Sequence, residues 1–129
     1  MNDTPSRRGF LRNAAAVASA PAFLQAQGTA NKLRMAWIGT GGRGYYLMQR
    51  HYEGSKDLGE VTHVCDAFTE RMARAKDLVQ STEKKTPKAV ADYREILRDP
   101  SVDAVVIATP EHLHYQMFMD AITICPTRA

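Results

Sequence analysis

The sequence predicts an α/β fold built on a doubly wound parallel sheet, and three observations predict it. Apolar, β-branched runs alternate with segments of helical apolar spacing from Leu33 onward. The last of these runs, Val102–Ala108, is almost continuously apolar, which is typical of a buried parallel strand. A glycine-rich turn, Gly39–Gly44, joins the first run to the first helical segment. This alternation favours parallel strands joined by crossover helices.

Eight elements are expected in strand–helix alternation. The expected strands are Leu33–Ile38, Glu60–Cys65, Ala89–Val90 and Val102–Ala108. The first two expected helices run from Gly42 to about Glu53 and from Glu70 to about Ser81. The third begins at Asp92 and ends at Asp99-Pro100, and the fourth begins at Thr109 and ends at Cys125-Pro126. Asp92 with Glu95 three residues later resembles a capping box. Phe118, Ala121 and Ile122 are expected on the inner face of the last helix.

Composition and charge exclude several classes of protein. The chain has 129 residues, 44% apolar and 24% charged, which suggests at most one globular domain. Its net charge of +3 falls to +1 without residues 1–26, and no basic stripe with interleaved aromatics is present, so we expect no nucleic-acid partner. Cys65 and Cys125 make no disulfide framework, and His112 and His114 lack the helical spacing of a metal pair, so we expect no metal.

Residues 1–26 resemble a twin-arginine export signal. Arg7-Arg8 precedes Phe10-Leu11, an apolar stretch runs from Ala14 to Leu24, and small residues offer cleavage after Ala22 or Ala26. The stretch is shorter than the roughly 20 apolar residues that span a bilayer, so we expect a removable signal and no stable membrane span. The twin-arginine export machinery is then a partner, and the location is periplasmic or extracellular. The alternative is a disordered tail with a chance arginine pair.

The glycine-rich turn fits the pattern G-x-G-x-x-G between a strand and a helix. The first glycine allows the tight turn, the second lets the backbone approach a diphosphate, and the third lets the helix pack closely. Asp66 ends the next strand, 22 residues after Gly44, where an acid binds a ribose diol. A Rossmann-type dinucleotide-binding site is therefore expected, with cofactor-binding residues Gly39, Thr40, Gly41, Gly42, Arg43, Gly44 and Asp66. The alternative is a glycine turn beside a surface aspartate.

Two further segments bear on the cofactor. The Asp66 carboxylate repels a 2′-phosphate, so we expect NAD; NADP stays possible because Arg43 and Arg71 lie near the phosphate and ribose positions in sequence. Thr109 and Pro110 follow the last strand, at the sheet edge where ligands bind in open α/β folds, and are expected to face the nicotinamide half. His114 is expected either to face the nicotinamide with them or to pack at the start of the helix.

These residues resemble the glucose–fructose oxidoreductase and inositol dehydrogenase family (Gfo/Idh/MocA). The matching stretches are Ile38–Gly44, Cys65-Asp66 with Glu70-Arg71, Asp92–Leu97, and Val102–Pro110 with His114, within about Lys32–Ile122. The resemblance implies a nicotinamide-dependent oxidoreductase acting on sugars, polyols or related compounds. It also implies a later Glu-Lys-Pro motif, whose lysine serves the active site, and a second α/β domain with a catalytic histidine. We therefore place no catalytic residue in this chain.

The expected organisation has four parts. Residues 1–26 are the signal, 27–31 a linker, 32–122 a partial Rossmann domain truncated after the fourth strand and its helix, and 123–129 an aberrant tail that resembles a truncated or frame-shifted end, with the substrate domain absent. The expected function is the NAD(P)-binding portion of an exported oxidoreductase, inactive by itself. The alternatives are an NAD-dependent glycoside hydrolase of the same family and a remnant that only binds nucleotide.

Overall fold

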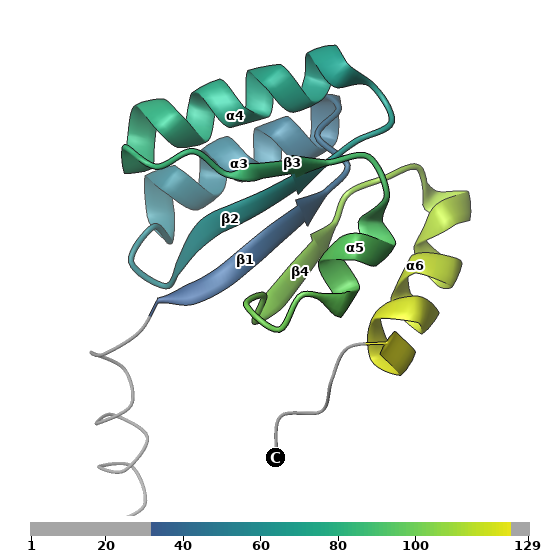
Figure 1. Ribbon diagram of the computed structural model, residues 1–129. Coiled ribbons are helices and arrows are strands. Elements are labelled where there is room, and N and C mark those ends of the chain that lie inside the picture. Colours follow the sequence, from purple (N-terminus) through teal and green to yellow (C-terminus); the bar gives the residue numbers. More distant parts are fainter. Residues whose placement is uncertain (1–31, 125–129) are drawn as a thin grey trace, which may run out of the picture. The chain divides into compact units, whose positions relative to one another are not determined.

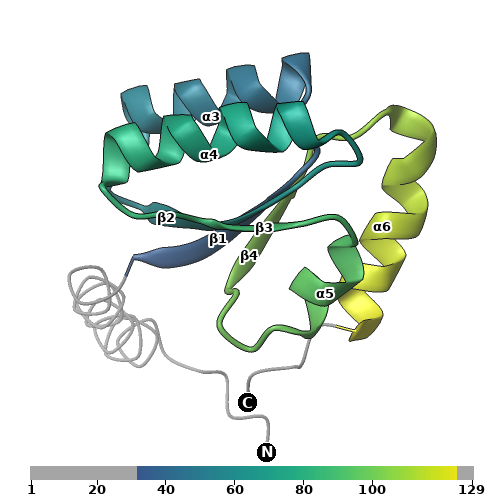
Figure 2. The same cartoon turned by 45° about the horizontal axis from the view of Figure 1, so that its top comes forward.

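The computed structural model describes residues 32–124, which form a parallel sheet with helices on both faces (Figure 1). The expected export signal, the whole of the expected linker, and the last five residues with Cys125 lie outside the described residues. Helices α3 and α4 cover one face of the sheet, and α5 and α6 lie on the other, as the turned view shows most clearly (Figure 2). This is the doubly wound arrangement that the sequence predicts.

The eight described elements follow the expected order. They are β1 (Leu33–Ile38), α3 (Gly42–Gly54), β2 (Gly59–Cys65), α4 (Thr69–Glu83), β3 (Lys88–Val90), α5 (Tyr93–Arg98), β4 (Ala104–Ile107) and α6 (Glu111–Ile124). Helix α6 continues through Thr123 and Ile124, so the first two residues of the expected tail belong to this helix.

The four strands are parallel, in the order β3-β2-β1-β4. The register aligns the last residues of neighbouring strands: Ile38 of β1 pairs with Cys65 of β2 and with Ile107 of β4, and Cys65 pairs with Val90 of β3. The loops that follow the four strands therefore meet at one edge of the sheet. This edge carries Gly39, Asp66 and Thr109.

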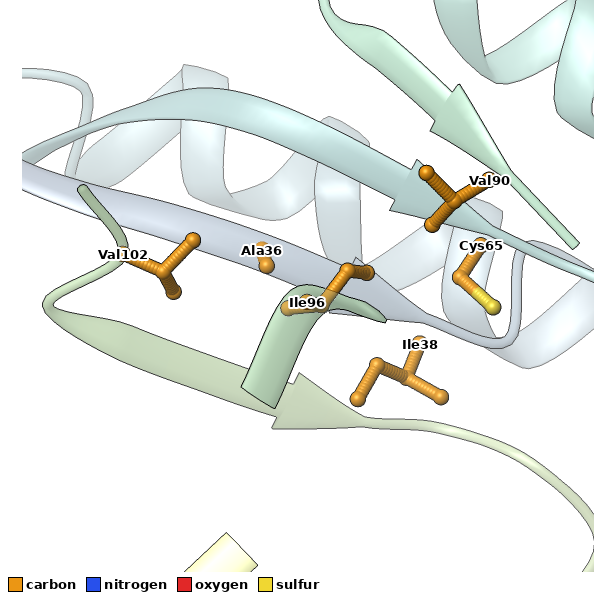
Figure 3. Close-up of a cluster of buried hydrophobic side chains, with 6 residues drawn as sticks. All are labelled: Ala36, Ile38, Cys65, Val90, Ile96 and Val102. Atoms are coloured by element: carbon orange, nitrogen blue, oxygen red, sulfur yellow. The ribbon is translucent and has the colours of Figure 1, made fainter. Parts of the chain in front are cut away.

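Alternating side chains of the strands build a hydrophobic core on each face. Ala36 and Ile38 of β1 pack on the face covered by α5, in a cluster completed by Cys65, Val90, Ile96 and Val102 (Figure 3). Trp37 points to the opposite face and packs with Met48, Val61, Val64, Ala75 and Val79 under α3 and α4. The Trp37 indole also donates to the Gly44 carbonyl, Nε1 to O 3.1 Å, which ties α3 to the central strand. Cys65 packs as the small hydrophobic residue that its sequence context predicts.

Strand β4 is shorter and less buried than its apolar sequence predicts. All four of its residues are half-buried, because β1 is its one strand neighbour among the described residues. Backbone pairing extends one residue beyond each end, since the Asp103 N–H donates to the Arg34 carbonyl and the Ala108 N–H to the Ile38 carbonyl. The Asp103 carboxylate also accepts from the Arg34 guanidinium, at 2.9 and 3.1 Å, which fixes the start of β4 against β1.

The helix starts follow the expected capping chemistry in part. The Asp92 carboxylate caps α5, but it accepts the N–H of Arg94 at 3.0 Å, whereas the Glu95 N–H donates to the Asp92 carbonyl. The Thr109 hydroxyl donates to the Met117 sulfur at 3.4 Å, and α6 begins only at Glu111, after Pro110. None of the helices in residues 32–124 has the length and apolar character needed to cross a membrane.

Candidate cofactor site

A cavity of about 480 Å³ lies at the carboxyl edge of the sheet. The four loops that follow the strands all contribute to its lining, through Gly39 after β1, Asp66 after β2, Ala91 after β3 and Thr109 after β4. Its size lies in the range of small-molecule sites, and its position is where open α/β sheets bind ligands.

Gly39 and Gly44 are required by the fold itself. Gly39 has a φ of +90°, and a Cβ there would lie 2.7 Å from the Ala108 carbonyl carbon and from the Thr109 nitrogen. A Cβ on Gly44 would lie 1.9 Å from the Gly39 carbonyl oxygen. These two glycines therefore let the turn form beside the end of β4 and let α3 pack onto that turn.

Gly41 is different, because nothing in the described fold demands a glycine there. Its φ is −65°, which any residue adopts, and a Cβ would meet only the end of the Arg71 side chain, at 3.4 Å. Gly41 is also the N-cap of α3 and provides no side-chain cap. The space above it thus adjoins the uncapped N-terminus of α3, where N–H groups and the helix dipole favour an anion. A dinucleotide diphosphate fits this position.

Asp66 lines the cavity at the end of β2 with a side chain that is largely buried. One carboxylate oxygen, Oδ2, accepts from the Thr40 backbone N–H at 2.8 Å and from the Thr40 hydroxyl at 3.2 Å. The other, Oδ1, accepts from the Phe68 N–H at 3.0 Å. Asp66 therefore connects the glycine turn to the loop after β2. Thr40 is fully buried and is not among the residues that line the cavity; the structure instead places its hydroxyl against Asp66.

The two arginines named from the sequence both line the cavity and are both exposed. The Arg71 guanidinium lies 4.3 Å from the centre of the Phe68 ring and next to Gly41. The Arg43 guanidinium lies 5.6 Å from the centre of the Tyr46 ring. Gly42 lies beside them with open space around its Cβ position. The glycine turn is thus flanked by positive charge, which suits a diphosphate.

The segment after β4 divides into two parts. Thr109 and Pro110 line the cavity opposite the glycine turn. His114 is not among the lining residues. Its ring Nε2 donates to the Thr109 carbonyl at 2.6 Å, a hydrogen bond that joins α6 to the segment just before the helix. The structure therefore places His114 in the packed position that the sequence left as one of two alternatives.

The cavity also includes residues that sequence reasoning did not name. Phe68 follows Asp66 by two residues, and Tyr93 begins α5 just after β3. Tyr93 Oη donates to Asp120 Oδ2 at 2.5 Å, and this hydrogen bond raises the pKa of the Tyr93 hydroxyl. Both residues follow strand ends, which is the signal that could have found them. Cys65 lines the cavity as well, and burial raises the pKa of its thiol to about 11, so the thiol is neutral.

The described residues contain no group of three His, Cys, Asp or Glu side chains placed to hold a metal ion. The polar groups that line the cavity include a carboxylate, two guanidinium groups and the backbone of a glycine turn. This donor set is the one that recognises phosphate and ribose.

Comparison with known proteins bears directly on this site. The sequence model of the oxidoreductase family with an NAD-binding Rossmann fold (Gfo/Idh/MocA) matches residues 33–124. A glycosyl hydrolase family 109 protein of Stenotrophomonas maltophilia (strain K279a) is 34% identical over 124 residues, covering 90% of this chain and 27% of that relative. An alpha-N-acetylgalactosaminidase of Shewanella oneidensis is 28% identical over 96 residues, covering 70% of this chain and 20% of that relative.

Among solved structures, an NAD-binding oxidoreductase from Klebsiella pneumoniae superimposes with a TM-score of 0.53 and 29% sequence identity. The match covers 73% of this chain and 25% of that one. The chain therefore spans about a quarter of the length of the relatives that it matches.

Proposed function

Because the chain belongs to the Gfo/Idh/MocA oxidoreductase family, as the NAD-binding Rossmann portion of such a protein, we propose that it holds NAD for an exported oxidoreductase acting on sugars, polyols or related compounds. The observation that carries the proposal is the position of Gly41 at the N-terminus of α3, where no side chain caps the helix, an added Cβ would meet only the Arg71 guanidinium, and Asp66 lines the same cavity. The nicotinamide ring, when bound, supplies hydride transfer, while this chain's residues bind and orient the dinucleotide.

The charge of Asp66 favours NAD over NADP in this proposal. A 2′-phosphate on the adenosine ribose would bring negative charge next to this carboxylate, and like charges repel at such short range. Arg71 opposes this preference, because its guanidinium lies beside Gly41 and could pair with the added phosphate. We expect Asp66 to dominate, since it is largely buried whereas Arg71 is exposed to water.

Calorimetric titration of the full 129-residue chain with NAD and NADP tests the cofactor choice. The wild type should bind NAD more tightly, and Asp66→Arg should move the ratio of the two affinities toward NADP by about tenfold or more, because it replaces a repelling charge with a pairing one. Asp57→Arg makes the same change of charge at an exposed position away from the cavity and should leave the ratio unchanged. An unchanged ratio in Asp66→Arg contradicts the proposal.

A second candidate function is NAD-dependent glycoside hydrolysis. The names of the two relatives reported above favour it, and a tightly held NAD would then serve a transient oxidation during hydrolysis. Both candidates need the longer protein, because we place no catalytic residue in this chain. The third hypothesis, a remnant that only binds nucleotide, predicts cofactor binding without oxidoreductase or glycoside hydrolase activity.

One assay separates the three candidates. The gene is expressed together with its downstream sequence, and the product is given NAD with either a sugar or polyol panel or a chromogenic α-N-acetylgalactosaminide. An oxidoreductase accumulates NADH and leaves the chromogenic substrate intact. A hydrolase releases the chromophore with no net NADH. Bound NAD with neither signal supports the remnant.

Export is proposed from the arginine pair near the N-terminus and the apolar stretch behind it. Residues 32–129 are only about three quarters of the chain, so the similarity to the Stenotrophomonas protein over 90% of the chain also reaches residues before Lys32. Replacing Arg7 and Arg8 together by lysine should retain the protein in the cytoplasm, whereas Arg12→Lys should leave export intact. Fractionation that finds the double variant exported contradicts the twin-arginine assignment.

A further inference from the structure

The hydrogen bonds of Asp66 are unequally distributed between its two carboxylate oxygens. Both donors of Thr40, the backbone N–H and the hydroxyl, bond to Oδ2, at 2.8 and 3.2 Å. Oδ1 accepts one described hydrogen bond, from the Phe68 N–H at 3.0 Å. A carboxylate has about four acceptor sites, two on each oxygen. The protein therefore fills both sites of Oδ2 and leaves one on Oδ1.

The surroundings of Thr40 keep both of its hydrogen bonds to Asp66 in place. Its side chain is completely buried, and the residue lies between Gly39, whose φ is +90°, and Gly41, the N-cap position of α3. The Gly39 N–H donates in turn to the Cys65 carbonyl at 2.8 Å, so the turn is fixed to β2 immediately before Asp66. A buried hydroxyl that gave up its hydrogen bond to Oδ2 would lose a charge-assisted bond without water to replace it.

We propose that Thr40 is a positioning residue that restricts Asp66 to one hydroxyl of the adenosine ribose. The ribose diol offers two O–H donors, but Asp66 offers one remaining acceptor site, on Oδ1. One hydroxyl is therefore bound by Asp66 and the other is not, so the ribose is held by a single hydrogen bond to this residue. The inference rests on the proposed role of Asp66 in NAD binding and adds to it which part of the ribose is recognised.

Titration of the full chain with NAD and with its 2′-deoxy and 3′-deoxy adenosine analogues tests the inference on the wild type. One analogue should bind within about twofold of NAD. The other should bind about tenfold more weakly, because it loses a hydrogen bond to a charged group. A similar loss of affinity with both analogues overturns the inference while leaving NAD binding intact. No binding of NAD itself overturns the proposed function, and the inference with it.

Substitutions at Thr40 test the cause. Thr40→Val removes the hydroxyl donor and opens a second acceptor site on Asp66, so both deoxy analogues should bind more weakly than NAD by about tenfold. Thr40→Ser keeps the hydroxyl, so only one of the two deoxy analogues should bind more weakly than NAD, as in the wild type; this is called the one-sided pattern. Thr62→Val removes a hydroxyl that donates to the Met35 carbonyl, away from the cavity, and should also retain it. If Thr40→Val still shows the one-sided pattern, Thr40 does not restrict Asp66 to one hydroxyl. If that variant does not fold, the titration of the wild type with the two analogues still tests the inference.

Discussion

Gly39, Gly41 and Gly44 differ in what an added side chain would meet. At Gly39 and Gly44 it would collide with backbone atoms of the turn or of the segment after β4, so the fold excludes any other residue. At Gly41 it would meet one flexible arginine. The sequence pattern treats the three alike, whereas the structure separates two glycines required for folding from one that leaves room for a ligand.

Alanine substitutions should separate these two requirements. Gly44→Ala should lower the free energy of unfolding by about 3 kcal/mol, because the new methyl group overlaps a backbone oxygen. Gly41→Ala should change it by less than about 1 kcal/mol while weakening NAD binding by about tenfold or more, since the methyl group occupies the diphosphate position. Urea unfolding and calorimetry measure both quantities.

Gly54 at the other end of α3 offers the matched control. A Cβ there has no atom within 4 Å, so Gly54→Ala should leave NAD affinity unchanged and the fold as stable or slightly more so. Equal NAD affinity in Gly41→Ala and the wild type would show that no ligand passes close above Gly41.

Sequence spacing predicts that Asp66 lies beside the glycine turn, because an acid after the second strand has a characteristic distance from that turn, and Asp66 does line the cavity there. Its ribose-binding role stays a prediction. The two hydrogen bonds from Thr40 to Asp66 could not be predicted, since they depend on how the turn folds back onto β2. The ring of His114 was left between two environments because its neighbours in space, unlike its neighbours in sequence, decide which way it points.

Among the elements, the strands were the most predictable and α6 the least. All four expected strands are present and parallel, and their order β3-β2-β1-β4 is that of the first four strands of a Rossmann sheet. Five large apolar side chains of helix α6 are exposed: Leu113, Tyr115, Phe118, Met119 and Ile122. Because apolar residues extend well beyond one side of the helix, sequence periodicity does not determine which of them face inward, and Phe118 and Ile122, expected inside, are 57% and 59% exposed.

The position of α6 depends on a polar contact with α5. Tyr93 Oη and Gln116 Nε2 both donate to the Asp120 carboxylate, at 2.5 and 2.7 Å, but only Tyr93 belongs to the other helix. Tyr93→Phe should therefore lower the free energy of unfolding by about 1 kcal/mol. Gln116→Ala removes a donor within the exposed surface of α6 and should cost less than about 0.5 kcal/mol. Urea unfolding compares them; an equal effect would mean that the contact between helices adds nothing.

At the scale of the whole molecule, stability should fall on mild acidification because of His63. Its side chain is buried, with Nε2 3.3 Å from Asp99 Oδ2 and Lys88 of β3 nearby. Burial, opposed by Asp99 and assisted by Lys88, lowers the pKa of His63 below its ordinary 6.5. Between the two pKa values the unfolded chain binds more protons than the folded one, so the free energy of unfolding decreases as pH falls through 6.5.

Urea unfolding between about pH 7.5 and pH 5.5 measures this dependence. His63→Gln should flatten it over that range, because the substituted side chain does not titrate. His112→Gln changes an exposed histidine at the start of α6 and should keep the wild-type slope. Equal slopes in His63→Gln and the wild type would assign the acid sensitivity to other groups.

The described surface also carries an apolar region that we expect to promote self-association. A groove of about 450 Å³ lies between α5, β4 and α6, and Val105, Ile107, Phe118 and Ile122 are among its lining residues. It lies beside β4, the half-buried strand at the edge of the sheet that residues 32–124 form. An apolar edge strand next to exposed apolar side chains is a site of self-association.

Charged substitutions on this groove should therefore raise solubility. Phe118→Lys combined with Ile122→Glu removes two exposed apolar side chains while keeping the net charge. Compared with the wild type, this double variant should form about severalfold less aggregate at high protein concentration, as measured by sedimentation and light scattering. Leu58→Glu removes a side chain that is 69% exposed but lies before β2, away from the groove, and should leave the aggregate unchanged. The free energy of unfolding should shift by no more than about 1 kcal/mol in either variant, because the replaced side chains are mostly in water already. If Leu58→Glu suppresses aggregation as strongly as the double substitution, general surface hydrophobicity, and not the groove beside β4, controls self-association.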